Sequence, residues 1–245
     1  MRDATKAGRQ LRRAASRSAL VAAAVLVALG IAAAAFWFWW LPGYRPTLAK
    51  GESYGVDVSA YQGRIDWTRV AEDHIRFAYI KADEGVTLVD RDFARNWAGA
   101  ASAGVRRGAY QFFSLCDPGI TQAQSFLRTV PRDAGALPPA VDLELAGNCR
   151  SRPSVAVVGA QLSAFLRAVQ RATGHAVVLY LGTDFAHRYS LGLERDHPLW
   201  LYRPLRPPAG ARWVVWQVDG RAHVSGIDGH VDLDVGRQPL FYPDR

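Results

Sequence analysis

The sequence predicts an irregular TIM-like α/β barrel, and three observations lead to that fold. Short apolar runs recur along most of the chain, as expected of strands. Helical patterns separate the earlier runs, which is the alternation of a (β/α) barrel. The last three runs lie too close together for full helices, so we expect helices to be missing between the last strands. The predicted strands are residues 54–59, 77–82, 108–113, 140–145, 177–182, 199–204, 214–219 and 230–235.

A basic segment and an apolar segment precede the predicted barrel. Residues 1–18 are rich in arginine, and residues 19–41 then carry no charge and contain five consecutive aromatic residues, 36–40, next to their end. At about 1.5 Å per residue, this run is long enough to span a bilayer with an aromatic belt at one end. The basic flank predicts a cytoplasmic N-terminus. The alternative is a cleaved signal peptide with its A-x-A site at residues 32–35.

Most of the net charge belongs to the basic tail. The chain carries a formal charge of +8, and residues 1–18 hold six basic side chains and one acid. The folded part is therefore only weakly basic, which argues against a nucleic-acid partner. We expect residues 42–53 to form a linker and residues 54–245 to form one domain.

Two helices are predicted from periodic apolar residues. In the first, Phe93, Trp97 and Ala101 recur every four residues, and Gly104 is suited to a left-handed stop. In the second, an apolar face begins after Pro153 and ends at Gly174.

Two acids in the fourth predicted strand are the strongest sign of catalysis. Successive strand residues point to opposite faces, so Asp142 and Glu144 share one face while Val141 and Leu143 share the other. With the apolar face against the helices, both acids face the barrel interior near the carboxyl end of the strand, where barrel enzymes keep their active sites. Two acids inside an apolar strand have no turn to serve.

The same alternation recurs in the first and last predicted strands. It places Asp57 on the interior face of the first, and Asp232 and Asp234 on the interior face of the last. The alternative for any single aspartate is a cap or turn at the end of a strand. Because His230 is the only histidine in or beside these strands, a zinc or two-metal hydrolase is disfavoured, and we expect no metal and no cofactor.

Aromatic side chains near the strand ends fit a sugar substrate, because flat rings stack on pyranose faces. Core packing is the competing explanation for each of them. Tyr110 and Tyr180 are the favoured substrate contacts. Further aromatic candidates are Tyr61, Trp200, Tyr202 and Trp216.

Cys116 and Cys149 are the only two cysteines, and we predict a disulfide between them. Each follows the carboxyl end of a predicted strand, and the two strands are consecutive. Adjacent strands lie about 4.8 Å apart, which suits disulfide geometry. Two free buried thiols are the alternative.

Several ordered motifs resemble glycoside hydrolase family 25, the Chalaropsis-type lysozymes. They are GVDVSAYQGRIDW (55–67), FAYIKADEG (77–85), the block at 92–113, PPAVDLE (138–144), and WQVDG followed by GHVDLDV. The resemblance runs from about Tyr54 to Gly236. It implies an irregular α/β barrel with N-acetylmuramidase activity on bacterial peptidoglycan.

The resemblance also implies roles for the acids. Glu144 matches the proposed general acid of the family and Asp142 the acid that assists it, while Asp57 and Asp232 match two further acids of the cleft. Asp232 is chosen over Asp234 because it is the first Asp of the family's V-D-x-[ND]-V pattern. Such an enzyme would sit on the bacterial cytoplasmic membrane with its domain in the periplasm or outside, or would be secreted if the segment is cleaved.

Two positions depart from the family pattern. Gln111 stands where the family commonly has His, so it cannot carry a proton, although it can still hydrogen-bond substrate. Tyr202 stands where a small residue is usual, which predicts a narrower cleft.

Two other functions are consistent with the sequence: a non-catalytic, membrane-tethered peptidoglycan-binding domain, and a hydrolase of another N-acetylhexosamine polymer.

Overall fold

The structure is a computed structural model that describes residues 22–210, 212–238 and 240. These residues form two compact units that divide between Tyr44 and Arg45. The predicted basic tail and the first residues of the predicted apolar span lie outside the described residues.

The N-terminal unit contains one apolar helix, Ala22–Gly43. It is α-helical over residues 22–35, continues as a π-helical turn, η1 (Phe36–Trp40), and ends in a 3-10 turn, η2 (Leu41–Gly43). The first and last rings of η1 stack with their centroids 4.9 Å apart. The helix is long and apolar enough to cross a membrane, and a signal sequence would have the same properties.

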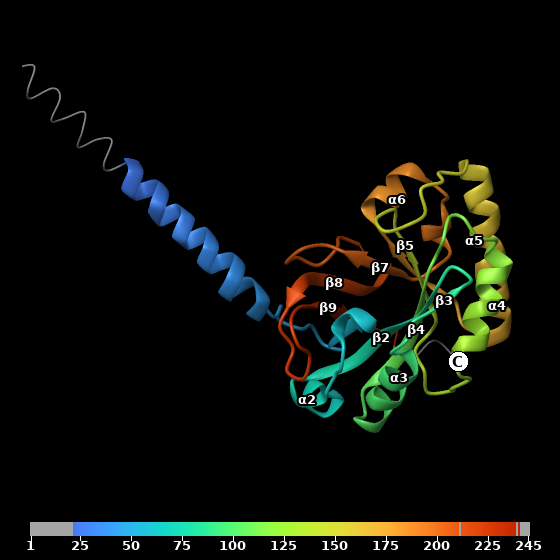
Figure 1. Cartoon of the computed structure of the whole chain (residues 1–245), viewed down its shortest axis with the longest axis horizontal. Helices are drawn as coiled ribbons and strands as arrows, with labels where there is room; N and C mark the ends of the chain where they lie inside the picture. Colours follow the sequence, from blue (N-terminus) through green and yellow to red (C-terminus); the bar gives the residue numbers. More distant parts are fainter. Residues whose placement is uncertain (1–21, 211, 239, 241–245) are drawn as a thin grey trace, which may run out of the picture. The chain divides into compact units, whose positions relative to one another are not determined.

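The C-terminal unit is a closed eight-stranded barrel with one additional short strand, which confirms the predicted irregular barrel (Figure 1). Around the barrel the strand order is β1-β2-β4-β5-β6-β7-β8-β9, and β9 returns to β1. The strands are β1 (Ser53–Val58), β2 (Ile75–Glu84), β3 (Leu88–Val89), β4 (Arg106–Phe112), β5 (Ala140–Leu143), β6 (Val178–Leu181), β7 (Leu199–Tyr202), β8 (Trp213–Ala222) and β9 (Val231–Gly236).

Strand β9 makes the barrel irregular, because it runs antiparallel to both of its neighbours, β8 and β1. The other barrel pairs are parallel. The described residues between β7 and β8, and those between β8 and β9, form no helix. This agrees with the predicted absence of helices near the end. The antiparallel β8–β9 pair needs no crossover, whereas β7 and β8 are parallel and the described residues of their connection contain no helix.

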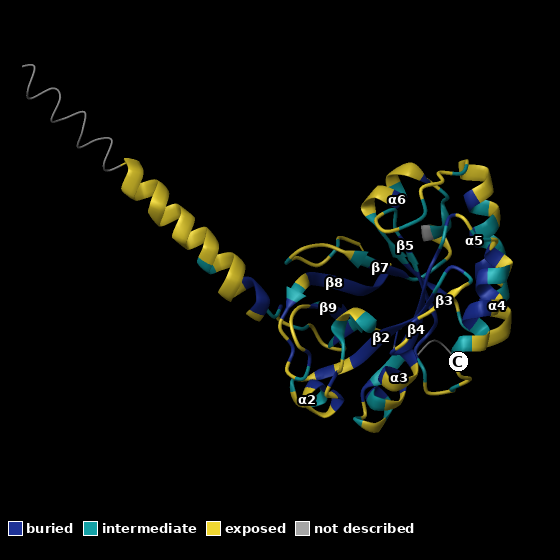
Figure 2. Ribbon diagram, viewed as in Figure 1, coloured by how far each residue is buried: buried dark blue, intermediate teal, exposed yellow. Residues whose placement is uncertain are grey.

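Helices cover the earlier strands and turn their exposed faces outward (Figure 2). The predicted second helix is α5, with Ser154 as its N-cap and Gly174 as its left-handed stop. Helix α4 was not predicted, because polar Gln122 and Ser125 occupy its buried face in place of an apolar stripe. The helices are α2 (Trp67–Glu72), α3 (Phe93–Ser102), α4 (Gly119–Thr129), α5 (Val155–Thr173) and α6 (Thr183–Arg188), with 3-10 turns η3 (Ala60–Gln62) and η4 (Leu193–Arg195).

A buried apolar cluster fills the barrel toward the amino ends of its parallel strands. Phe77, Tyr79 and Val178 belong to it, and Leu240 packs into it from the end of the chain. Since the interior is packed there, room for a ligand remains only toward the carboxyl ends.

The predicted linker is largely part of the barrel domain. Arg45 Nη2 donates to the His223 carbonyl at 2.7 Å and lies 3.5 Å from an Asp73 carboxylate oxygen. Tyr54 Oη donates to the Pro46 carbonyl at 2.5 Å. These contacts hold Arg45 and Pro46 against the domain, so this part of the predicted linker belongs to the folded unit.

Candidate active site

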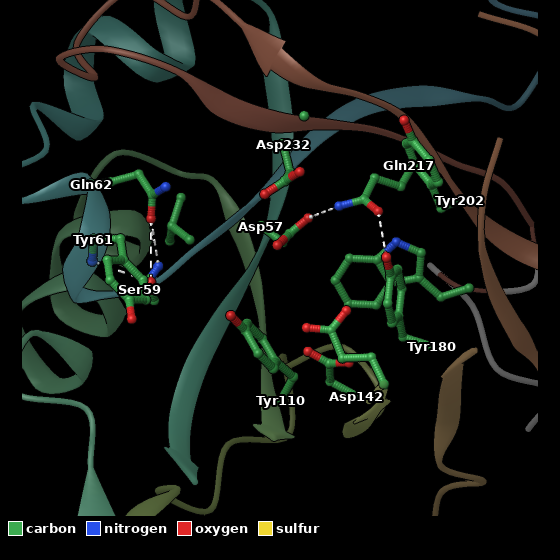
Figure 3. Close-up of a pocket in the computed structure, with 14 residues that line it drawn as sticks. Asp57, Ser59, Tyr61, Gln62, Tyr110, Asp142, Tyr180, Tyr202, Gln217 and Asp232 are labelled. Atoms are coloured by element: carbon green, nitrogen blue, oxygen red, sulfur yellow. Dashed lines mark hydrogen bonds between the residues drawn. The ribbon is translucent and has the colours of Figure 1, made fainter. Parts of the chain in front are cut away.

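One pocket lies at the carboxyl ends of the parallel strands, with a volume of about 360 Å³ (Figure 3). All four predicted catalytic carboxylates line it, as do five of the six predicted aromatic contacts. These residues are Asp57, Asp142, Glu144, Asp232, Tyr61, Tyr110, Tyr180, Trp200 and Tyr202. The other lining residues are Val58, Ser59, Gln62, Gln217 and Gly220.

Strand β5 brings two of the carboxylates to the pocket. Asp142 lies within the strand, and Glu144 directly follows its last residue, Leu143. Val141 and Leu143 are buried on the opposite face, so the alternation inferred from the sequence is present in the structure.

Burial is the main cause that raises the pKa of both β5 acids. Repulsion from Glu144 raises the pKa of Asp142 further, whereas the Lys81 ammonium opposes the rise. The pKa of Glu144 is raised by burial and then by repulsion from Asp184 and Asp232. A carboxyl held this way keeps its proton to a higher pH than in water, as a general acid requires.

Strands β1 and β9 supply the opposite side of the pocket. Asp57 and Asp232 are direct partners in the antiparallel ladder, so two acids face each other across neighbouring strands. Burial and then repulsion from Asp232 raise the pKa of Asp57 well above its usual range. Burial and then repulsion from Asp219 raise the pKa of Asp232 to about 6.

Gln217 ties the two sides of the pocket together. Its Nε2 donates to Asp57 Oδ2 at 3.2 Å, and its Oε1 accepts the Tyr180 hydroxyl at 2.9 Å. The donated bond favours the ionised form of Asp57 and partly offsets the rise in its pKa.

Asp234 is inside the barrel but does not line the pocket. Its carboxylate is fully buried and accepts a hydrogen bond from Trp200 Nε1 at 3.1 Å. Trp200 in turn stacks on Tyr79 in the apolar cluster, with ring centroids 4.9 Å apart. Trp200 therefore serves both as a wall of the pocket and as part of the core.

Two tyrosines stand at opposite ends of the pocket in Figure 3, Tyr61 on the η3 turn and Tyr202 at the end of β7. Tyr61 is 93% exposed and Tyr202 is 47% exposed. Tyr202 lines the pocket. An exposed ring on a pocket wall is available to stack on a sugar.

Gln111 and Trp216 do not line the pocket, contrary to the sequence-based expectation. Gln111 directly follows Tyr110 in β4, so the two side chains point to opposite faces; its Nε2 donates to the Gly85 and Phe112 carbonyls. Trp216 is likewise out of phase with Gln217 in β8, and its Nε1 donates to the Arg203 carbonyl at 2.7 Å.

Hydrogen bonds of Asn148 and a disulfide hold the segment that carries Glu144 in place. Asn148 Nδ2 donates to the carbonyls of Glu144 and Phe113, while its Oδ1 accepts from the Leu115 and Cys149 amides. Cys149, which follows Asn148, forms a disulfide with Cys116 in the loop after β4, and their Cα atoms lie 6.1 Å apart. The loops after β4 and β5 are thus linked covalently and by hydrogen bonds.

Across the described ranges, no group of three or more His, Cys, Asp or Glu side chains is arranged to hold a metal ion.

Comparison with known proteins identifies the family. Residues 56–227 match the family described as glycosyl hydrolases family 25. The chain belongs to glycosyl hydrolase family 25.

Named relatives and solved structures of family 25 extend this match. The chain is 37% identical over 208 residues to "Uncharacterized protein YegX" of Escherichia coli O157:H7, covering 79% of this chain and 75% of the relative. It is 30% identical over 192 residues to Lysozyme M1 of Streptomyces globisporus, covering 73% of this chain and 65% of that protein. A solved family 25 glycosyl hydrolase from Bacillus anthracis superposes with a TM-score of 0.72 at 32% identity, covering 82% of this chain and 94% of that one.

The family 25 match and the pocket do not coincide along the whole chain. The matched residues contain Asp57, Asp142 and Glu144 but end before Asp232, which reaches the pocket on β9. The apolar helix Ala22–Gly43 lies before the matched residues. The place of Asp232 in the site therefore rests on strand register and pocket geometry.

Sequence reasoning missed two supporting residues, Gln217 and Asn148. Strand alternation could have found the first, because polar Gln217 lies between apolar Trp216 and Val218 in β8. Nothing in the sequence pattern singles out Asn148, whose contacts come from two separate loops.

Proposed function

We propose that this family 25 glycosyl hydrolase is a muramidase that cleaves the β-1,4 bond between N-acetylmuramic acid and N-acetylglucosamine in peptidoglycan. The observation that carries the proposal is the convergence of Asp57, Asp142, Glu144 and Asp232 on one pocket. Glycoside hydrolysis needs acids of different proton affinity around a single bond. The relative named Lysozyme M1 supports the same substrate class.

In this proposal Glu144 is the general acid. Burial raises the pKa of its carboxyl, so the acid form persists to a higher pH than in an exposed glutamate. Glu144 donates that proton to the glycosidic oxygen as the bond to the anomeric carbon breaks. Asn148 holds the Glu144 carbonyl at 3.0 Å, which limits movement of the acid relative to the sugar.

Asp142 stabilises the positive charge that develops on the sugar ring. It acts on that charge directly, or it orients the substrate N-acetyl group as an internal nucleophile. Participation of the N-acetyl group retains the anomeric configuration, whereas direct attack by water on the face opposite the leaving group inverts it. Proton NMR of the first product formed distinguishes them.

The position of Gln111 supports catalysis over a purely binding role. Its departure from the family pattern would count against catalysis if the side chain faced substrate. Instead its Nε2 donates to two backbone carbonyls away from the pocket. All four acids to which the resemblance assigns roles line the pocket.

The test is incubation of the full-length protein, in a mild detergent, with purified peptidoglycan, followed by borohydride reduction and mass analysis. We expect new reducing ends to appear as N-acetylmuramitol. Reduced N-acetylglucosamine ends would indicate a different glycosidase. Binding to peptidoglycan with no new ends would refute catalysis and indicate a peptidoglycan-binding domain.

We also propose that the apolar helix holds the domain at the outer face of the bacterial cytoplasmic membrane, with the N-terminus in the cytoplasm. The helix Ala22–Gly43 supports this placement, and so does the basic flank of residues 1–18. A domain anchored in this way would act on glycan near the membrane.

A further inference from the structure

A second hollow adjoins the proposed active-site pocket, and Tyr61 lines both. The hollow has a volume of about 320 Å³. Its walls come from the η3 turn, from the end of β2 and from the short strand β3 with the residues that follow it. Tyr61 stands at one end of the active-site pocket in Figure 3, so the hollow and the pocket meet at that end.

Hydrogen bonds hold the walls of this hollow in place. Buried Asp90 accepts from the Ala60 amide at 2.8 Å and from the Asp92 amide at 2.9 Å, which ties the segment after β3 to the η3 turn. Ser59 and Gln62 form a capping box around the same turn. The hollow is therefore a fixed feature of the fold, as a binding site requires.

The lining combines exposed apolar side chains with a cation. Leu88 is 49% exposed and Val89 is 54% exposed, and both lie beside the exposed ring of Tyr61. Contiguous exposed apolar groups next to a cleft indicate a ligand contact. Lys81 Nζ forms an ion pair with Glu84 Oε2 at 2.8 Å. Arg91 also lines the hollow and is exposed.

This lining does not fit a further sugar. A sugar presents several hydroxyl groups and needs matching donors and acceptors, whereas two aliphatic side chains and an internal ion pair occupy much of this wall. Small methyl side chains and a carboxylate fit it better, because Leu88 and Val89 accept the methyl groups and Arg91 binds the carboxylate.

We propose that this hollow binds the peptide carried by the muramic acid residues of peptidoglycan. The proposal rests on the muramidase function and deepens it, since the lactyl group directs the peptide away from a sugar seated in the neighbouring pocket. Methyl side chains of that peptide pack on Tyr61, Leu88 and Val89, and a peptide carboxylate pairs with Arg91. The protein then prefers glycan that bears peptide over bare glycan.

The test measures binding and turnover on two matched substrates: glycan strands with their peptides, and the same strands after an amidase has removed them. Binding is measured by calorimetry with the full-length Glu144→Gln variant in detergent, so this readout does not depend on catalysis. We expect tighter binding of peptide-bearing strands by about tenfold, the change that follows from one charge-assisted hydrogen bond. Wild-type kcat/KM should show the same preference.

Arg91→Gln and the double variant Leu88→Ser, Val89→Ser should each reduce the preference and leave binding of bare strands unchanged. The matched control is Arg167→Gln, at an exposed arginine of α5 outside the hollow. Equal binding of the two substrates by the parent protein, or a preference that survives Arg91→Gln and the double variant, would overturn the proposal. Selective binding without any cleavage would refute the muramidase function alone.

A longer glycan site would give another result. If the hollow holds a sugar, the variants would weaken bare and peptide-bearing strands equally, and the loss would appear only when the strand is long enough to pass Tyr61. That outcome would also overturn the peptide assignment.

Discussion

Replacing Asp232 with asparagine is expected to stabilise the folded chain at neutral pH while it lowers turnover. Burial and repulsion from Asp219 raise the pKa of Asp232 from its ordinary value of 3.8 to about 6. One pKa unit corresponds to about 1.36 kcal/mol, so the ionised carboxylate destabilises the folded state by about 3 kcal/mol. Asparagine keeps the shape of the side chain and removes the charge.

The pH range of this effect follows from the direction of the shift. The folded state binds the Asp232 proton more tightly than the unfolded state, so stability from this group is full below about pH 4. It is lost as pH rises from about 4 through about 6. The advantage of Asp232→Asn over wild type should therefore be near zero at pH 4 and about 3 kcal/mol above pH 7.

The assay is urea unfolding of the full-length wild type and variant in the same detergent at several pH values between 4 and 8. Asp228→Asn is the matched control, since it removes an exposed carboxylate from the loop that joins β8 and β9; its effect should be small and should not grow with pH. A free-energy difference for Asp232→Asn that is the same at pH 4 and pH 8 would refute the reasoning.

Three further predictions follow from the same structure. Glu144→Gln should lower turnover by about 10²- to 10⁴-fold with binding retained, whereas exposed Glu72→Gln should not; equal turnover would show that another group is the acid. Thiol labelling of the unfolded, unreduced chain should find neither Cys116 nor Cys149 free, and reduction should destabilise the fold by about 4 kcal/mol; two labelled thiols would disprove the bridge. The full-length protein should remain with membranes after a high-salt wash because of residues 22–43, unless sequencing of the mature N-terminus finds cleavage at the end of that segment.

The spacing of apolar runs and helical patterns was enough to predict the fold class, and alternation within strands placed the acids on the interior face. The choice of Asp232 over Asp234 came from the resemblance to glycoside hydrolase family 25. A strand places every second residue on one face, so Asp142 and Glu144 could be assigned to the interior from four letters of sequence. The same rule excludes Gln111 from the pocket once Tyr110 faces it, because consecutive strand residues point to opposite faces.

Contacts between distant segments were decided only by the tertiary structure. Gln217 bonds Asp57 from 160 residues away, and the antiparallel direction of β9 sets Asp57 opposite Asp232. Neither fact has a local signal, because strand direction and register depend on how the whole barrel closes. The sequence by itself determined which acids face the barrel interior. Closure of the barrel decided which residues lie next to each acid. Those neighbours, together with burial, set the pKa values of the acids.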